Sequence, residues 1–171
     1  SLSDLPTNFV QIGSAFWSKY NSYADDGGKG IVRYPVGSCA RSGYYYNESA
    51  CRRIVGKLGG CHIPTVSDFW DMSHYLISKG LSLRALKATN LVYFNSIAPR
   101  NLNYNEFNVV GNGYWANNSL INSKDQGTFA VDLDDHSSLS MASFMRSEAD
   151  GTLTGFMGSN GLRLVLNKYV I

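Results

Sequence analysis

Four side chains in the C-terminal half could together hold a metal ion or move a proton. They form the acidic cluster of the chain and are Asp132, Asp134, Asp135 and His136. Hard cations such as calcium require several oxygen ligands that converge on one point. Side chains that alternate in direction along a strand do not converge unless the strand bends. We therefore expect a solvated strand end and turn here, with a secondary binding site as the alternative, and we predict no metal or other cofactor.

Three cysteines are the next candidates for chemistry: Cys39, Cys51 and Cys61. An odd number allows at most one intramolecular disulfide and leaves one thiol. We favour a disulfide between Cys39 and Cys51, which closes a tyrosine-rich loop and leaves Cys61 buried beside a helix. A bond between Cys51 and Cys61 is the alternative. A zinc site that adds His62 and His74 to these thiols lacks the paired spacings of structural zinc modules.

No catalytic motif stands out in the chain. The Gly-x-Ser-x-Gly elbow of serine hydrolases does not occur. The turn cluster at residues 25–30, DDGGKG, lacks the Gly-Lys-Ser/Thr ending of a phosphate loop and the carboxylate spacing of an EF-hand. We therefore predict no catalytic residues and interpret the chain as a binding domain rather than an enzyme.

Two polar, asparagine-rich segments have no predicted packing role, residues 100–108 and residues 116–126. Long loops in compact domains are usually functional. Amide groups donate and accept hydrogen bonds at once, so they suit a neutral polar partner. Aromatic rings supply apolar anchors, and an arginine supplies a planar fork of donors. The predicted binding residues are Arg100, Tyr104, Phe107, Trp115, Asn117 and Asn118.

The element expected to position these loops is one main helix over residues 66–79. Thr65 is a suitable N-cap and Asp68 follows three residues later, as in a capping box, while Gly80 is a plausible stop. The apolar row at helical spacing consists of Phe69, Met72 and Leu76. Trp70 lies in a neighbouring row that we also expect to reach the core. The rest of the chain is predicted to be β-rich.

Composition limits the classes of function. A chain of 171 residues can bury a substantial core, and we expect residues 1–171 to form one domain. A net charge of +2 with 16% charged residues is far from the strongly basic composition of nucleic-acid binders, so we predict no nucleic-acid partner. Abundant tyrosine and glycine with little charge is typical of β-rich extracellular binding domains.

No run of about 18 apolar residues occurs, so we predict no membrane insertion. Because the chain starts at Ser1 rather than Met, we expect a fragment or processed piece.

Three short motifs resemble those of a known superfamily. Residues 60–70, GCHIPTVSDFW, resemble the G-W-[RH]-L-P-T-x-x-E-[WF] signature, with Cys61 in the usual Trp position. Tyr114-Trp115 resembles part of G-x-Y-W-S-S-T, although Ala116 and two asparagines replace the hydroxyl run. Residues 161–165, GLRLV, resemble a closing G-x-x-V-R-C-V strand without its cysteine. These signatures belong to bacterial domains of the C-type-lectin-like superfamily, such as Fibrobacter-type major paralogous domains and the C-terminal domain of Legionella collagen-like adhesin.

The resemblance implies an α+β, C-type-lectin-like fold, with the main helix on antiparallel sheets and the N- and C-terminal strands paired. It also implies an extracellular or bacterial cell-surface recognition module, for instance the tip of an intimin/invasin-type adhesin, that serves cell adhesion in virulence. The expected partner is a host-cell surface protein. One alternative is a calcium-independent glycan-binding module, because the calcium-binding tripeptides of sugar-binding members, Glu-Pro-Asn and Gln-Pro-Asp, are absent. A second alternative is a degenerate formylglycine-generating-type enzyme.

Overall fold

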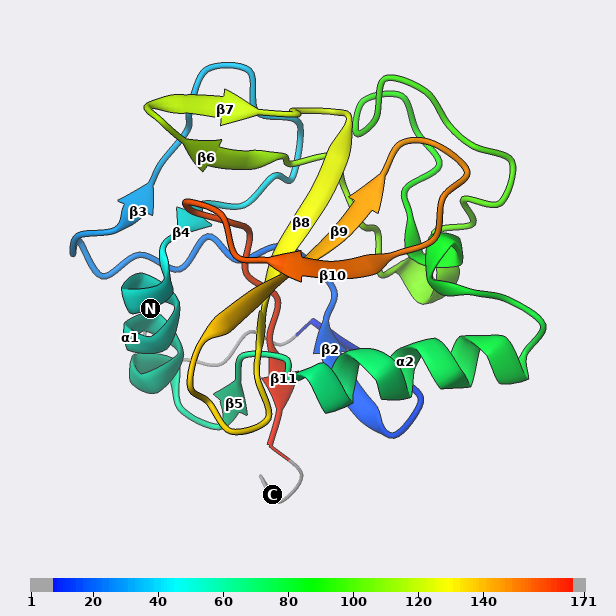
Figure 1. The fold of residues 1–171 in the computed structure, drawn as a ribbon, viewed down its shortest axis with the longest axis horizontal. Coiled ribbons are helices and arrows are strands. Elements are labelled where there is room, and N and C mark those ends of the chain that lie inside the picture. The colour runs from blue at the N-terminus through cyan, green and yellow to red at the C-terminus, as the bar shows by residue number, and fades with distance from the viewer. Residues whose placement is uncertain (1–7, 168–171) are drawn as a thin grey trace.

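The computed structural model describes residues 8–167 and has an α+β fold, as predicted. Figure 1 shows the two α-helices at the lower left and lower right, with strands between and above them. Two short 3-10 helices, η1 (Leu83–Leu86) and η2 (Tyr104–Glu106), lie in the long connection between α2 and β6. The α-helices and strands are β1 (Phe9–Ile12), β2 (Ala15–Ser18), β3 (Ile31–Val32), β4 (Tyr45–Tyr46), α1 (Glu48–Leu58), β5 (Cys61–His62), α2 (Val66–Ser78), β6 (Tyr114–Ala116), β7 (Ser119–Ile121), β8 (Gln126–Asp132), β9 (Leu139–Met145), β10 (Thr152–Gly155) and β11 (Val165–Leu166).

The two ends of the described chain meet in one sheet, with strand order β1-β2-β11-β5. Val165 in β11 lies opposite Trp17 in β2 on one side and opposite His62 in β5 on the other, and both pairings are antiparallel. The predicted pairing of N- and C-terminal strands is therefore confirmed. A second antiparallel sheet, β10-β9-β8, crosses the centre of the molecule, and the hairpins β3-β4 and β6-β7 stand apart from it (Figure 1).

Helix α2 begins as the sequence indicates and ends at Ser78, one residue before the predicted end. The hydroxyl of Thr65 accepts from the backbone N–H of Asp68 at 3.1 Å, and the Asp68 carboxylate accepts from the backbone N–H of Thr65 at 3.0 Å. The predicted apolar row is buried. The prediction for Trp70 is wrong, because 42% of its surface is exposed; its ring forms a T-shaped pair with that of Phe69, with ring centroids 5.2 Å apart.

A second helix of similar length, α1, corrects the prediction of one main helix. Its N-cap is Asn47, whose side-chain oxygen accepts from the backbone N–H of Ala50 at 2.9 Å. The buried face repeats at helical spacing and consists of Ala50, Cys51, Ile54, Val55 and Leu58. Two adjacent arginines and a glycine interrupt this row in the sequence and weaken its periodic signal. The asparagine cap was the local signal that could have identified the helix.

The predicted Cys39–Cys51 disulfide is absent, because all three cysteines are free and buried. Cys51 lies on the inner face of α1, in a core cluster that also contains Cys61 but not Cys39. Its thiol donates to the backbone oxygen of Tyr46 at 3.8 Å. Burial raises the pKa of Cys51 to about 12 and those of Cys39 and Cys61 to about 11. Thiols with such pKa values contain almost no thiolate near neutral pH, so they behave as core side chains.

Candidate functional site

The predicted binding loop at residues 100–108 does not expose all the side chains that we expected. The Arg100 side chain is 71% exposed, whereas Tyr104 is partly buried against the main core. Phe107 is fully buried and makes edge contacts with Trp17 and Phe129 at ring distances of 5.7 and 6.3 Å. The prediction that Phe107 contacts a ligand is therefore wrong. The ring instead anchors the loop in the hydrophobic core.

A buried arginine donates hydrogen bonds to the backbone of the same loop. Arg163, which is 1% exposed, donates to the backbone oxygens of Phe107 at 2.6 Å and Asn108 at 2.8 Å, and to the amide oxygen of Asn21 at 2.6 Å. Its guanidinium lies 4.3 Å from the centroid of the Phe107 ring. Carbonyl dipoles and an aromatic face therefore replace the water that this cation loses on burial. Loop 100–108 is fixed at its C-terminal end rather than free to reorganise.

The other predicted binding loop contains the turn of a tight hairpin. Asn117 and Asn118 connect β6 to β7, with Ala116 opposite Ser119. Their φ angles are +52° and +60°, in the left-handed region that two-residue hairpin turns require and asparagine tolerates. Both side chains are exposed, whereas Trp115 is half-buried. The turn geometry therefore accounts for both asparagines without a ligand.

The six predicted binding residues do not form one surface. Figure 1 shows the β6-β7 hairpin at the upper left, while the green loops that follow α2 lie on the right, beyond the central strands. Arg100 and Tyr104 belong to these right-hand loops, and Trp115 with the two turn asparagines belongs to the hairpin. A binding surface must therefore be sought on one side or the other.

An open polar hollow of about 340 Å³ lies beside loop 100–108. Its wall also includes the ion pair of Lys19 with Glu106, and Arg41, whose guanidinium lies 4.2 Å from the centroid of the Tyr20 ring. The aromatic and amide residues of the wall are Tyr20, Tyr93, Asn90, Asn103 and Asn108. The sequence indicated the loop but not this hollow, because Tyr20, Arg41 and Tyr93 reach it from distant parts of the chain.

The backbone of this loop is held in an uncommon conformation. Asn103, Asn105, Glu106 and Asn108 have φ angles of +46°, +50°, +59° and +55°. Asparagine tolerates this left-handed region, but a glutamate there is strained by about 1 kcal/mol or more. The ion pair with Lys19 holds Glu106 in place. Asn103 Oδ1 is buried without a hydrogen-bond partner among residues 8–167.

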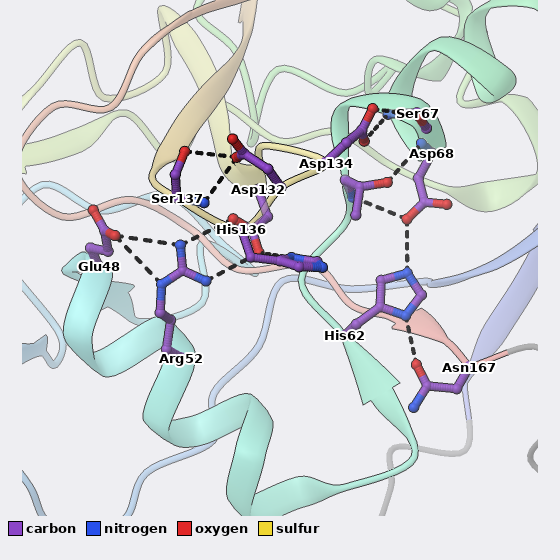
Figure 2. Close-up of polar contacts among 12 residues, drawn as sticks. Glu48, Arg52, His62, Ser67, Asp68, Asp132, Asp134, His136, Ser137 and Asn167 are labelled. Atoms are coloured by element: carbon purple, nitrogen blue, oxygen red, sulfur yellow. Dashed lines mark hydrogen bonds and ion pairs between the residues drawn. The ribbon is translucent and has the colours of Figure 1, made fainter.

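The acidic cluster of the sequence is used in three separate contacts (Figure 2). The buried Asp132 accepts from the Arg52 guanidinium at 3.0 and 3.1 Å and lies 2.8 Å from Nδ1 of His136. Asp134 accepts from the backbone N–H and the hydroxyl of Ser67 at the start of α2, at 3.0 and 2.7 Å. The carboxylate of Asp135 accepts from the hydroxyl and N–H of a neighbouring serine, Ser137. These carboxylates do not converge on one point, and their contacts connect α1, β8 and α2.

A histidine that sequence reasoning did not pair with a partner lies next to this cluster (Figure 2). His62 Nε2 is 2.8 Å from the Asp68 carboxylate, and Nδ1 is 2.7 Å from the side-chain oxygen of Asn167. The hydrogen bond with Asp68 raises the pKa of His62 although burial opposes the increase. Burial also opposes ionisation of Asp68, but hydrogen bonds from His62 and Thr65 lower the pKa of that carboxyl. The pair joins β5 to the first turn of α2.

Comparisons with protein-family models, with curated proteins and with solved structures find no match to this chain. Across residues 8–167, none of the helices is long and apolar enough to cross a membrane. Function must therefore be inferred from the chemistry of the site itself.

Proposed function

We propose that this chain is a recognition module of an extracellular bacterial adhesin with a C-type-lectin-like fold. The sequence motifs that resemble this superfamily support the proposal. So does the α+β architecture, in which a capped helix and paired terminal strands occur together. The proposed role is binding and not catalysis, since the polar groups of the candidate hollow are amides, phenols, a threonine hydroxyl, the Arg41 guanidinium and a closed ion pair.

The polar hollow beside loop 100–108 carries the proposal for the ligand, which is an uncharged glycan. Sugars are bound by amides that donate and accept hydrogen bonds and by aromatic side chains that pack on their apolar faces. Tyr20 and Tyr93 supply the aromatic groups, and three asparagines supply the amides. Lys19 and Glu106 neutralise each other, and the remaining charge of the wall is the Arg41 guanidinium, which lies over the Tyr20 ring. No group of carboxylates in its wall calls for calcium.

A second candidate ligand is a host-cell protein, and one specific observation favours it. Leu91 and Val92 are 60% and 49% exposed and lie between Asn90 and Tyr93, which both line the hollow. Large exposed aliphatic side chains next to a polar hollow suit a protein interface with a few apolar anchors. A glycan would leave these two side chains in water.

Binding to a glycan array, followed by calorimetry with the best ligand, tests the proposal. Tyr20→Leu removes an aromatic ring from the hollow and should weaken binding about ten-fold, because a ring contact contributes about 1–1.5 kcal/mol. Tyr23→Leu is the matched control, since Tyr23 is a partly exposed tyrosine of the same segment that packs on Tyr44 outside the hollow. Equal losses in both variants would place the ligand elsewhere. Binding to host cells that is lost in Leu91→Ser but retained in Tyr20→Leu would favour the protein partner.

A further inference from the structure

A second hollow, larger than the first, lies at the other end of loop 100–108. Its volume is about 550 Å³, and it shares no lining residue with the polar hollow. It lies between the end of α2, helix η1 and the start of the loop. Residues of its wall that matter for binding are Leu81, Ser82, Arg84, Pro99, Arg100 and Leu102.

Two guanidinium groups at this hollow share a single carboxylate. Arg84 Nη1 lies 3.2 Å from Glu148 Oε1, and Arg100 Nε lies 3.6 Å from the same oxygen. The second distance is too long for a hydrogen bond, and within residues 8–167 Arg100 makes none. The Arg100 side chain is 71% exposed. One cation of the pair therefore remains available to a second anion.

Buried contacts fix this arrangement before any ligand arrives. The ammonium group of Lys87, which is 0% exposed, donates to the backbone oxygens of Met145, Ser147 and Ala149 at 3.0, 2.6 and 3.3 Å. These bonds hold the turn that carries Glu148. The backbone N–H of Arg84 donates to the Asp150 carboxylate at 2.7 Å, which ties η1 to the same turn.

We propose that this second hollow binds a carboxylate from an acidic peptide segment of a protein partner, between Arg84 and Arg100. Guanidinium forks match the two oxygens of a carboxylate, and Glu148 already shows a carboxylate in reach of both arginines. Leu102 is 51% exposed at the rim, and Leu81 and Pro99 lie beside it in the wall. An aliphatic side chain next to the carboxylate finds an apolar surface there. A sugar acid would place its hydroxyl groups against the same apolar surface, where these side chains offer them no hydrogen bonds.

The site does not depend on the proposed glycan hollow, so each can fail alone. N-acetylleucine tests it in a chemical-shift titration, since this probe has a carboxylate beside an isobutyl group. N-acetylleucinamide lacks the charge, acetate lacks the isobutyl group, and glucuronate represents a sugar acid. We expect N-acetylleucine to bind more tightly than the other three and to shift signals at the second hollow.

Three variants separate binding from stability. Arg100→Gln should weaken N-acetylleucine binding about five-fold, the usual effect of one exposed charge pair of about 1 kcal/mol. Glu148→Gln should strengthen binding several-fold, because it removes the internal competitor for both arginines. Arg146→Gln is the control, as Arg146 is an exposed arginine paired with Asp125 outside the hollow, and it should change nothing.

Two outcomes would overturn the proposal. Glucuronate that binds as tightly as N-acetylleucine would assign the site to acidic sugars. Unchanged or weaker binding in Glu148→Gln, with an unchanged melting temperature, would show that the arginines serve only the internal ion pair.

Discussion

Replacement of Phe107 tests whether loop 100–108 is anchored in the core or free to act as an exposed binding loop. The ring is fully buried, contacts Trp17 and Phe129 at their edges, and lies under the guanidinium of Arg163. Core Phe→Ala changes cost about 3–5 kcal/mol, and loss of a desolvated cation–π contact adds about 1–2 kcal/mol. We therefore expect Phe107→Ala to lower the free energy of unfolding by about 4–7 kcal/mol.

Urea denaturation followed by tryptophan fluorescence measures this loss as a shift of the midpoint. Phe107→Leu keeps most of the apolar volume and should cost only about 1–1.5 kcal/mol beyond the lost ring contact. An exposed loop position would tolerate either change within about 0.5 kcal/mol. A Phe107→Ala variant with near wild-type stability would refute the burial of this ring and the anchoring of the loop.

The remaining predictions concern α2, the His62 pair and the cysteines. Trp70→Ala should cost less than about 2 kcal/mol and Phe69→Ala about 3–5 kcal/mol in the same assay, because only Phe69 is fully buried; equal costs would contradict this difference. The raised pKa of His62 gives a stabilisation that is complete below its ordinary pKa of 6.5 and lost as pH rises through the raised value, so His62→Gln should flatten the loss of stability that begins above pH 6.5. The lowered pKa of Asp68 gives a stabilisation lost as pH falls below its ordinary value of 3.8, so Asp68→Asn should remove part of the acid sensitivity. Alkylation in denaturant without reductant should modify all three cysteines, as counted by mass spectrometry. A single modified cysteine would show that the other two form a disulfide.

A local signal was sufficient for helix α2, whereas the terminal strands were expected from the resemblance. The Thr65–Asp68 capping box lies within four residues of sequence, and the structure contains both of its hydrogen bonds. Helix α1 was missed because charged residues interrupt its apolar row, although Asn47 supplied a cap signal. A closing strand over residues 161–165 was expected from the resemblance, whereas the observed β11 is Val165–Leu166, shares only Val165 with that range and pairs with β2.

The candidate site was harder to predict because composition does not separate binding from backbone requirements. Asn117 and Asn118 occupy a turn that needs positive φ angles, and the same need accounts for several asparagines of loop 100–108. Phe107 lies in a polar stretch, and only tertiary packing on Trp17 reveals it as a core residue. The hollow beside Tyr20 depends on segments that are far apart in the chain, so no local pattern could identify it.

Chemical-shift mapping on ¹⁵N-labelled protein tests the central proposal most directly. The best glycan from the array is added to the wild-type protein, and the perturbed backbone and side-chain amide signals are assigned. We predict saturable shifts that centre on Asn90, Asn103 and Asn108 and are weakened in Tyr20→Leu. Shifts confined to the β6-β7 hairpin around Asn117, or no saturable shift with any glycan, would contradict the proposed site.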